Sequence, residues 1–160
     1  MLIRPARTDE LPVLFSIYET ARQFMAANGN PTQWPKGYIQ PGQLAADIEA
    51  GQLYVCADSD GVQAVFLFAP GPDATYAQIR QGSWPSDEPY HVIHRVASAG
   101  RVKGLLGQIL AWAASQAPVL RMDTHADNKP MQHLLEKYGF VRCGIITVED
   151  GTERIAYQKG

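Results

Sequence analysis

The feature that most constrains the fold is a strand-like run that passes directly into a glycine-bearing turn and then into a helix. Residues 91–97 predict a β-strand, residues 101–114 predict an α-helix, and residues 119–123 predict a second strand. A strand, a helix and a strand in this order form a crossover connection, which brings parallel strands into one sheet. The second half of the chain therefore requires a mixed α/β architecture.

The remaining segments add antiparallel elements. Thr8 is expected to cap the first helix, which carries apolar residues at three- and four-residue spacing. The other expected elements are an edge strand at 1–4, a helix from 8 to the turn at 28–31, a helix at 43–50, strands at 53–57 and 62–69, a helix at 129–137, and a closing hairpin of strands 140–148 and 153–158. This order predicts the α/β fold class: a single domain over residues 1–160 with a mixed, mostly antiparallel sheet and helices on both faces.

The balance of charges and the two cysteines limit the classes of function that the chain is expected to have. The chain has 14 basic and 16 acidic residues and a formal net charge of −2, which argues against a nucleic-acid partner but permits a local anion site. No apolar run approaches the ~18 residues of a membrane span, so we expect a soluble, cytoplasmic protein with no membrane partner. Cys56 and Cys143 lie in strand-like runs and are expected to be buried, reduced thiols.

The glycine-bearing turn has the residues that suit a phosphate-containing ligand. Backbone N–H groups at the start of a helix lack intrahelical partners, and the helix dipole adds positive potential there. Gly104 and Gly107 allow phosphates to approach the backbone, and Arg101 and Lys103 supply positive charge. The alternative is that the glycines only permit tight packing. The sequence has neither a Walker loop nor the glycine spacing of a dinucleotide fingerprint.

Two motifs in the second half of the chain carry a family resemblance. The first is Arg101-Val-Lys-Gly104-Leu-Leu106, and the second is Asp123-Thr-His-Ala-Asp-Asn128-Lys-Pro-Met131 followed by Glu136-Lys-Tyr-Gly139-Phe140. Together they resemble the GNAT superfamily of acetyl-CoA-dependent N-acyltransferases. That family has Arg or Gln, two residues, Gly, one residue, and Gly or Ala after its fourth strand, followed by an Asn-containing helix and a Gly-Phe strand entry. Only the last position of the first motif departs from this pattern, and the element order matches over nearly the whole chain.

The resemblance implies an acetyl-CoA site along this stretch. The backbone of Val96 and Ser98 is expected to hold the pantetheine arm as an added strand, with Asn128 near its end. Asn128 suits the N-cap of the following helix equally well. The N–H groups expected to hold the pyrophosphate belong to Arg101, Val102, Lys103, Gly104, Leu106 and Gly107. Leu106 stands where the family has a small residue, and a shifted register that uses Gly107 is an alternative.

Acyl transfer to an amine also requires a group that takes a proton from the amine. His94 is the candidate base, because strand alternation places it on one face with Val96 and because imidazole titrates near neutral pH. The alternative is a structural, hydrogen-bonded histidine. The family's frequent general acid, a Tyr four residues before its Gly-Phe pair, is replaced here by Leu135, so that role is not carried over. Tyr138 is expected to serve packing.

The acceptor site has no motif. The irregular stretch 70–89 is a candidate substrate wall. Four aromatic residues in or beside loops either line an acceptor pocket or cover the core, and we favour the pocket: Trp34, Tyr38, Trp84 and Tyr90. The four histidines lack the close spacing of a zinc centre, so no metal is expected.

These observations predict an N-acetyltransferase that moves an acetyl group from acetyl-CoA to a primary amine of a small molecule. A peptide N-terminus or a lysine is an alternative acceptor. Two alternative functions remain: a CoA-binding module without strong catalysis that acts as a sensor or partner protein, and an α/β protein that binds no CoA. The terminal hairpin would allow a homodimer.

Overall fold

The computed structural model describes all residues from 1 to 160. Its strands form one seven-stranded sheet in the order β1-β2-β3-β4-β5-β7-β6. The pairings β1–β2, β2–β3, β5–β7 and β6–β7 are antiparallel, and β4–β5 is parallel. The strands are β1 (Leu2–Pro5), β2 (Leu53–Asp58), β3 (Gly61–Pro70), β4 (His91–Ser98), β5 (Leu120–Thr124), β6 (Val141–Thr147) and β7 (Glu153–Lys159). The helices are α1 (Leu11–Ala27), α2 (Pro41–Glu49), α3 (Leu105–Gln116) and α4 (Lys129–Lys137), with 3-10 turns η1 (Thr8–Glu10) and η2 (Ala74–Tyr76). The predicted fold class is confirmed.

Residue contacts divide the chain into two compact units. The first comprises Met1–Phe68 and His94–Trp112, and the second comprises Ala69–Ile93 and Ala113–Gly160. Strands β3 and β4 and helix α3 each contribute residues to both units. Each unit is described by itself.

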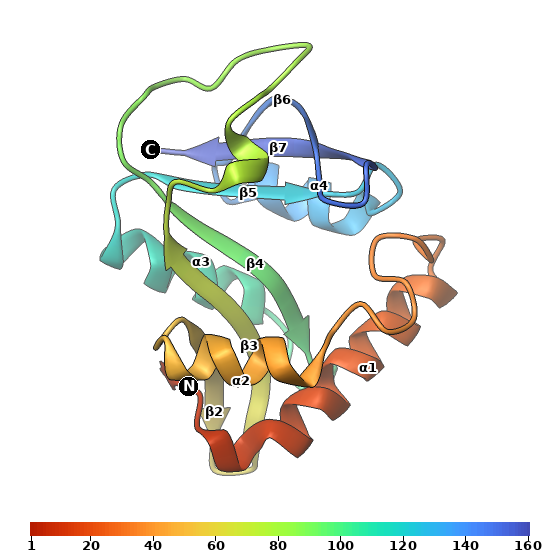
Figure 1. Ribbon diagram of the computed structural model, residues 1–160. Coiled ribbons are helices and arrows are strands. Elements are labelled where there is room, and N and C mark those ends of the chain that lie inside the picture. The colour runs from red at the N-terminus through yellow and green to blue at the C-terminus, as the bar shows by residue number, and fades with distance from the viewer. The chain divides into compact units, whose positions relative to one another are not determined.

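In the first unit, β2 and β3 alternate their side chains between two covered faces. Leu53 and Val55 are completely buried in a cluster with residues of α1 and α2. Tyr54, which lies between them, contacts Trp112 of α3, with ring centroids 4.9 Å apart. Because successive strand side chains point to opposite faces, α1 and α2 cover one face of these strands and α3 covers the other (Figure 1). Burial of a side chain such as Leu53 contributes about 1.5–3 kcal/mol.

The turn between β2 and β3 is stabilised by an aspartate. Asp58 Oδ1 accepts hydrogen bonds from Gln63 Nε2 at 3.1 Å and from the backbone N–H of Asp60 at 2.9 Å. Together these bonds lower the pKa of Asp58. Gly61 has φ 110°, a conformation that a residue with a side chain rarely adopts. The predicted hairpin is confirmed at this position.

The start of α1 differs from the prediction. Thr8 does not cap the helix; it begins a 3-10 turn, Thr8–Glu10, that precedes α1. The Glu10 carboxylate instead accepts the backbone N–H of Arg7 at 2.8 Å and both terminal nitrogens of Arg4 at 2.7 and 3.0 Å. A carboxylate satisfies a free N–H at a helix start as well as a hydroxyl does, and it also neutralises the nearby arginine.

In the second unit, β7 is the central strand between β5 and β6, and α4 packs against β6. Helix α4 begins and ends at the predicted residues. The long connection after β3 is fastened to β6 by a short bridge, in which the backbone N–H of Arg80 donates to Ile145 O at 3.0 Å and Ile145 N–H donates to Arg80 O at 2.8 Å. Glycines allow this approach, because a Cβ on Gly82 would lie 1.9 Å from Cys143 O and a Cβ on Gly144 would lie 2.7 Å from Arg80 O.

Both cysteines are free and buried, as predicted. Burial raises the pKa of Cys56 to about 11 and raises the pKa of Cys143 as well. Neither thiol is therefore an activated nucleophile near neutral pH. No helix has the length and the apolar character that crossing a membrane requires.

Candidate functional site

The turn that joins β4 to α3 is longer than predicted. The helix begins at Leu105 rather than at residue 101, and residues 100–104 form a bend. Gly100 and Gly104 have φ values of 81° and 77°, which a right-handed helix cannot include. The predicted start of the helix at Arg101 was wrong. The left-handed conformation of Gly104 cannot be part of the helix, which therefore begins four residues later, at Leu105.

The bend is held by contacts within the first unit. The backbone N–H of Ala99 donates to Gln63 O of β3 at 2.9 Å, and Gly100 N–H donates to Ser98 Oγ at 3.0 Å. Arg101 Nη2 donates to Val62 O at 3.2 Å. The turn is therefore fastened at its entrance to the neighbouring strand β3.

The start of α3 leaves backbone donors for an anion. Gln108 N–H reaches back to Gly104 O at 3.3 Å, so the N–H groups of Leu105, Leu106 and Gly107 belong to the first turn and have no intrahelical acceptor. A Cβ at Gly100 or Gly104 would meet no other atom within 4 Å, so the backbone of the bend faces open space. Lys103 is exposed beside it. This arrangement fits a phosphate or pyrophosphate.

Strand β4 is distorted at Arg95, just before the turn. Arg95 has φ 51°, and its carbonyl accepts the hydroxyl of Tyr18 from α1 at 2.9 Å. Burial raises the pKa of Tyr18, which keeps the hydroxyl protonated as a donor. The guanidinium of Arg95 forms an ion pair with Asp47 of α2. Its Nε is buried without a hydrogen-bond partner.

The distortion bears on the expectation for His94, which stays a prediction. The prediction that His94 and Val96 share one face assumed regular alternation along β4. Alternation is interrupted at Arg95, which lies between them, because a residue with positive φ does not continue an extended strand. His94 is half-buried. Its expected role as base rests on its position in β4 before the turn and not on a face shared with Val96.

The pairing of β4 with β5 covers only part of β4. It consists of His91 with Leu120 and Val92 with Arg121, although β4 continues to Ser98. The backbone of Val96 and Ser98 lies outside this pairing. An extended ligand can be added beside a strand only where the backbone on that side is not paired with another strand, and this part of β4 meets that condition on the side of β5.

Asn128 of the second sequence motif and Leu135, which lies between the two parts of that motif, both have structural roles. Asn128 is the N-cap of α4, where its Oδ1 accepts the backbone N–H of Met131 at 3.2 Å. This confirms the capping interpretation, and the cofactor role stays a prediction. Leu135 is completely buried, so the position of the family's tyrosine is a core position here.

The aromatic residues of the first unit belong to its core. Trp34 is only 7% exposed and packs edge-on against Tyr18, with centroids 5.7 Å apart. Tyr38 stacks on the outer side of Trp34 at 6.2 Å and is 44% exposed. The favoured interpretation of this pair as a pocket wall is wrong for Trp34, which fills space between α1 and the strands.

The aromatic residues of the second unit enclose an arginine. The guanidinium of Arg121 on β5 lies 4.0 Å from the ring centroids of both Trp84 and Tyr90. Its Nε donates to Gln158 Oε1 and its Nη2 to Ser86 O, each at 2.9 Å. Trp84 and Tyr90 therefore fasten the long connection to the sheet through cation–π contacts. Neither residue belongs to the lining of the pocket described next, and the expectation that they line an acceptor pocket stays a prediction.

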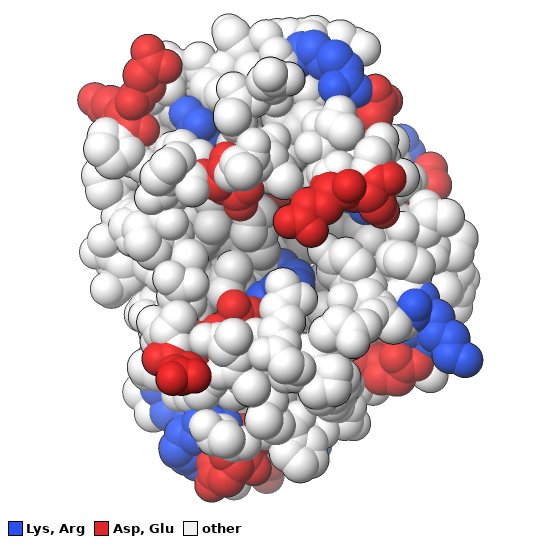
Figure 2. Space-filling view, viewed as in Figure 1, with Lys and Arg blue, Asp and Glu red and all other residues white.

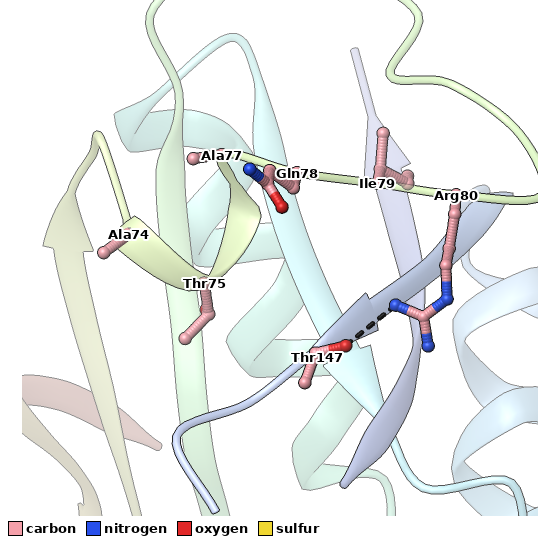
Figure 3. A pocket seen from close by; sticks show the side chains of 7 residues that line it. All are labelled: Ala74, Thr75, Ala77, Gln78, Ile79, Arg80 and Thr147. Carbon is pink, nitrogen blue, oxygen red and sulfur yellow. Dashed lines mark hydrogen bonds between the residues drawn. The ribbon is translucent and has the colours of Figure 1, made fainter. Parts of the chain in front are cut away.

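A pocket of about 640 Å³ lies in the second unit, between η2 with the segment that follows it and the end of β6 (Figure 3). This volume is within the range of small-molecule sites. The pocket contains residues of the stretch 70–89, whose role as a substrate wall stays a prediction; its lining consists of Ala74, Thr75, Ala77, Gln78, Ile79, Arg80 and Thr147.

Sequence reasoning missed the Arg95–Asp47–Tyr18 cluster and the roles of Arg80 and Arg121. One signal was present, because an arginine inside an otherwise apolar strand must find a partner when the strand is covered. The partners are distant in the sequence: those of Arg95 come from α1 and α2, those of Arg80 from β6 and β7, and those of Arg121 from β7 and the long connection.

On the face shown in Figure 2, acidic and basic side chains are interspersed and separated by uncharged residues. This distribution agrees with the small net charge. No group of three or more His, Cys, Asp or Glu side chains is placed to hold a metal ion.

Comparison with known proteins identifies the family. A GNAT-family acetyltransferase from Streptococcus agalactiae 2603 is 30% identical, with a TM-score of 0.90 over 99% of this chain and 94% of that one. A candidate acetyltransferase from Staphylococcus aureus Mu50 is 25% identical, with a TM-score of 0.74 over 100% and 99% of the two chains. A GNAT-family acetyltransferase from Listeria monocytogenes 4b F2365 shares the fold at 18% identity, with a TM-score of 0.74 over 99% and 93%. No protein-family model and no curated relative matches the sequence. On the strength of the Streptococcus relative, the chain belongs to the GNAT family of acetyltransferases.

Proposed function

We propose that this protein transfers the acetyl group of acetyl-CoA to a primary amine of a small molecule, and that the bend before α3 holds the pyrophosphate of the cofactor. The observation that carries the proposal is the open backbone of this bend. Gly100 and Gly104 have left-handed conformations with no atom near their missing side chains, and the first-turn N–H groups of α3 follow directly. Arg101 and Lys103 add positive charge, and membership of an acetyltransferase family supports the same ligand.

The thioester of acetyl-CoA supplies the acetyl group. In the transfer, the nitrogen of a neutral amine forms a bond to the carbonyl carbon, the C–S bond breaks, and the amine loses a proton. We propose that His94, which lies in β4 four residues before Ser98, takes this proton from the amine. The part of β4 that lies outside its pairing with β5 is proposed to offer backbone groups to the developing oxyanion and to the pantetheine arm, with Val96 and Ser98 as the expected contacts. The leaving thiolate takes its proton from water.

The test of the function is turnover. Purified protein is mixed with acetyl-CoA and a panel of primary amines, and both free CoA thiol and the acetylated amine are measured. We expect both products in equal amounts, and thiol release without acetylated amine would contradict transfer to the amine.

The test of the base uses His94→Ala and His94→Gln. If His94 takes the proton, turnover falls about 10²- to 10⁴-fold, mainly at pH values below the pKa of the acceptor amine. Thermal unfolding of each variant is measured alongside. A variant that retains the wild-type pH profile would contradict the assignment.

A second candidate function is a CoA-binding module without efficient catalysis. It is favoured by Leu135, which is completely buried at the position of the family's frequent general acid. Saturable acetyl-CoA binding without turnover on any amine would support this function over the first.

A further inference from the structure

We propose that Tyr18 and Asp47 are positioning residues for acetyl-CoA, because they hold Arg95 of β4 in its left-handed conformation. This conformation sets the direction of the backbone of Val96 and Ser98, which is proposed to receive the pantetheine arm. All five residues belong to the first unit. The inference rests on the proposed function, because the pantetheine arm is part of the cofactor of that function.

The conformation of Arg95 costs free energy. Its φ is 51°, and a residue with a side chain rarely adopts the left-handed region, least of all inside a strand. The Nε atom of its guanidinium is buried without a hydrogen-bond partner, which adds a second cost. Backbone strain of this kind persists only where surrounding contacts impose it, and it is frequent at functional sites. Arg95 has such contacts from two helices, α1 and α2.

The hydroxyl of Tyr18 holds the carbonyl of Arg95. In a regular strand a carbonyl points along the sheet to a neighbouring strand. The carbonyl of Arg95 instead accepts the hydroxyl of Tyr18, on helix α1, at 2.9 Å. Tyr18 is only 1% exposed and packs against Trp34, so its hydroxyl has little freedom to move away. This hydrogen bond therefore favours the turned carbonyl over the regular strand.

The carboxylate of Asp47 holds the side chain of the same residue. It forms an ion pair with the guanidinium of Arg95, and only 10% of the arginine side chain and 19% of the aspartate side chain are exposed. Loss of one partner from a pair so far removed from water leaves the other charge buried and unpaired, which is costly. Two helices thus fix the carbonyl and the guanidinium of Arg95 at the same time.

The conformation of Arg95 determines how β4 continues. A left-handed residue bends a strand, so the segment that follows it leaves in a different direction. Val96 and Ser98 lie in this segment, which ends where the backbone N–H of Ala99 donates to Gln63 O at 2.9 Å. The pyrophosphate, in contrast, is proposed to bind the bend that comes after this segment. Loss of the Arg95 conformation should therefore affect the pantetheine arm and not the nucleotide.

The experiment compares two ligands that differ in this arm. Acetyl-CoA carries it, and 3′-phospho-ADP is the nucleotide part of CoA without it. Binding of each ligand to the full chain is measured by calorimetry, and the unfolding temperature of every protein is measured alongside. The variants are Tyr18→Phe and Asp47→Asn. Their matched controls are Tyr54→Phe, which removes a hydroxyl on the α3 face of the sheet, and Glu49→Gln, which removes a charge from an exposed position of α2.

We expect Tyr18→Phe and Asp47→Asn to weaken the binding of acetyl-CoA about twofold to tenfold, because a smaller fraction of the protein then has β4 in the binding conformation. Their binding of 3′-phospho-ADP should stay unchanged, and both controls should bind both ligands as the wild type does. Lys103→Glu, which alters the bend, should weaken the binding of both ligands.

A second comparison tests the backbone conformation itself. Arg95→Gly and Arg95→Ala remove the same ion pair, but glycine adopts the left-handed conformation far more easily than alanine. Arg95→Gly should therefore bind acetyl-CoA more tightly than Arg95→Ala. In a regular strand the order would be the reverse, because glycine weakens a strand.

Equal weakening of both ligands by Tyr18→Phe and Asp47→Asn, or unchanged binding of acetyl-CoA, would overturn the inference and leave the proposed function standing. So would an Arg95→Ala protein that binds acetyl-CoA as tightly as Arg95→Gly. If Tyr18→Phe or Asp47→Asn is too unstable to measure, the order of the two Arg95 variants decides. A wild-type protein that fails to bind acetyl-CoA, or 3′-phospho-ADP, would contradict the proposed site at the bend and this inference with it.

Discussion

At the scale of single residues, buried charged side chains form hydrogen bonds and ion pairs with partners that cannot be identified from the sequence. Glu10 accepts hydrogen bonds from Arg4 and from the backbone of Arg7, and its side chain is only 9% exposed. The hydrogen bonds from Arg4 hold the pKa of Glu10 below its ordinary value. The carboxylate therefore stabilises the folded protein in its charged form.

Glu10→Gln should lower the free energy of unfolding by about 1–3 kcal/mol at pH 7. Because the folded-state pKa is lowered, the stabilisation is present above the unfolded value of about 4.3 and is lost as pH falls through the folded value. Urea denaturation between pH 3 and pH 7 measures this, and the difference between variant and wild type should shrink below about pH 4. Glu19→Gln, which alters an exposed pair with Arg22, is the control and should change stability less. A difference that grows on acidification would contradict the account.

At the scale of elements, glycines determine where a segment can approach a strand. The segment around Gly82 lies so close to β6 that a side chain would collide with the carbonyl of Cys143. This contact positions the wall of the pocket, because Arg80 joins the same strand two residues earlier.

Gly82→Ala should displace this segment from β6 and destabilise the protein by about 1–3 kcal/mol. Gly42→Ala is the matched control, because a Cβ at Gly42 within α2 meets no atom within 4 Å and alanine favours a helix. The midpoints of urea unfolding should fall for the first variant and stay equal or rise for the second. Equal midpoints for Gly82→Ala and the wild type would show that the segment does not depend on this approach.

Element order could be predicted from the sequence, whereas certain boundaries and faces could not. Apolar alternation identifies β2 and β3, and the apolar spacing identifies α1, because each pattern follows the burial of one face. The start of α3 was placed four residues early, because the left-handed conformation of Gly104 is set by the surrounding chain. The face of His94 was assigned from regular alternation, but Tyr18 and Arg95 meet across 77 positions in the sequence and the strand is distorted there.

At the scale of the whole molecule, the sequence predicted the mixed sheet and the family, and the 30% identical structural relative confirms both. The residues of the bend before α3 were found because a local motif carries them. The pocket was not found in detail, because Arg80 and Thr147 are 67 residues apart in the sequence and the isolated bridge of Arg80 to Ile145 of β6 brings them together. The lining of the pocket thus depends on long-range contacts, whereas the bend consists of consecutive residues.

The most direct test of the account is calorimetric titration of the protein with acetyl-CoA, with NADH and ATP as control ligands. Lys103→Glu reverses a charge beside the bend, and Lys36→Glu makes the same reversal at another exposed position of the first unit. We predict saturable binding of acetyl-CoA alone, weakened about tenfold or more by Lys103→Glu and unchanged by Lys36→Glu. No binding of acetyl-CoA at millimolar concentration, or equal binding by all three proteins, would contradict the assignment of the cofactor to this turn.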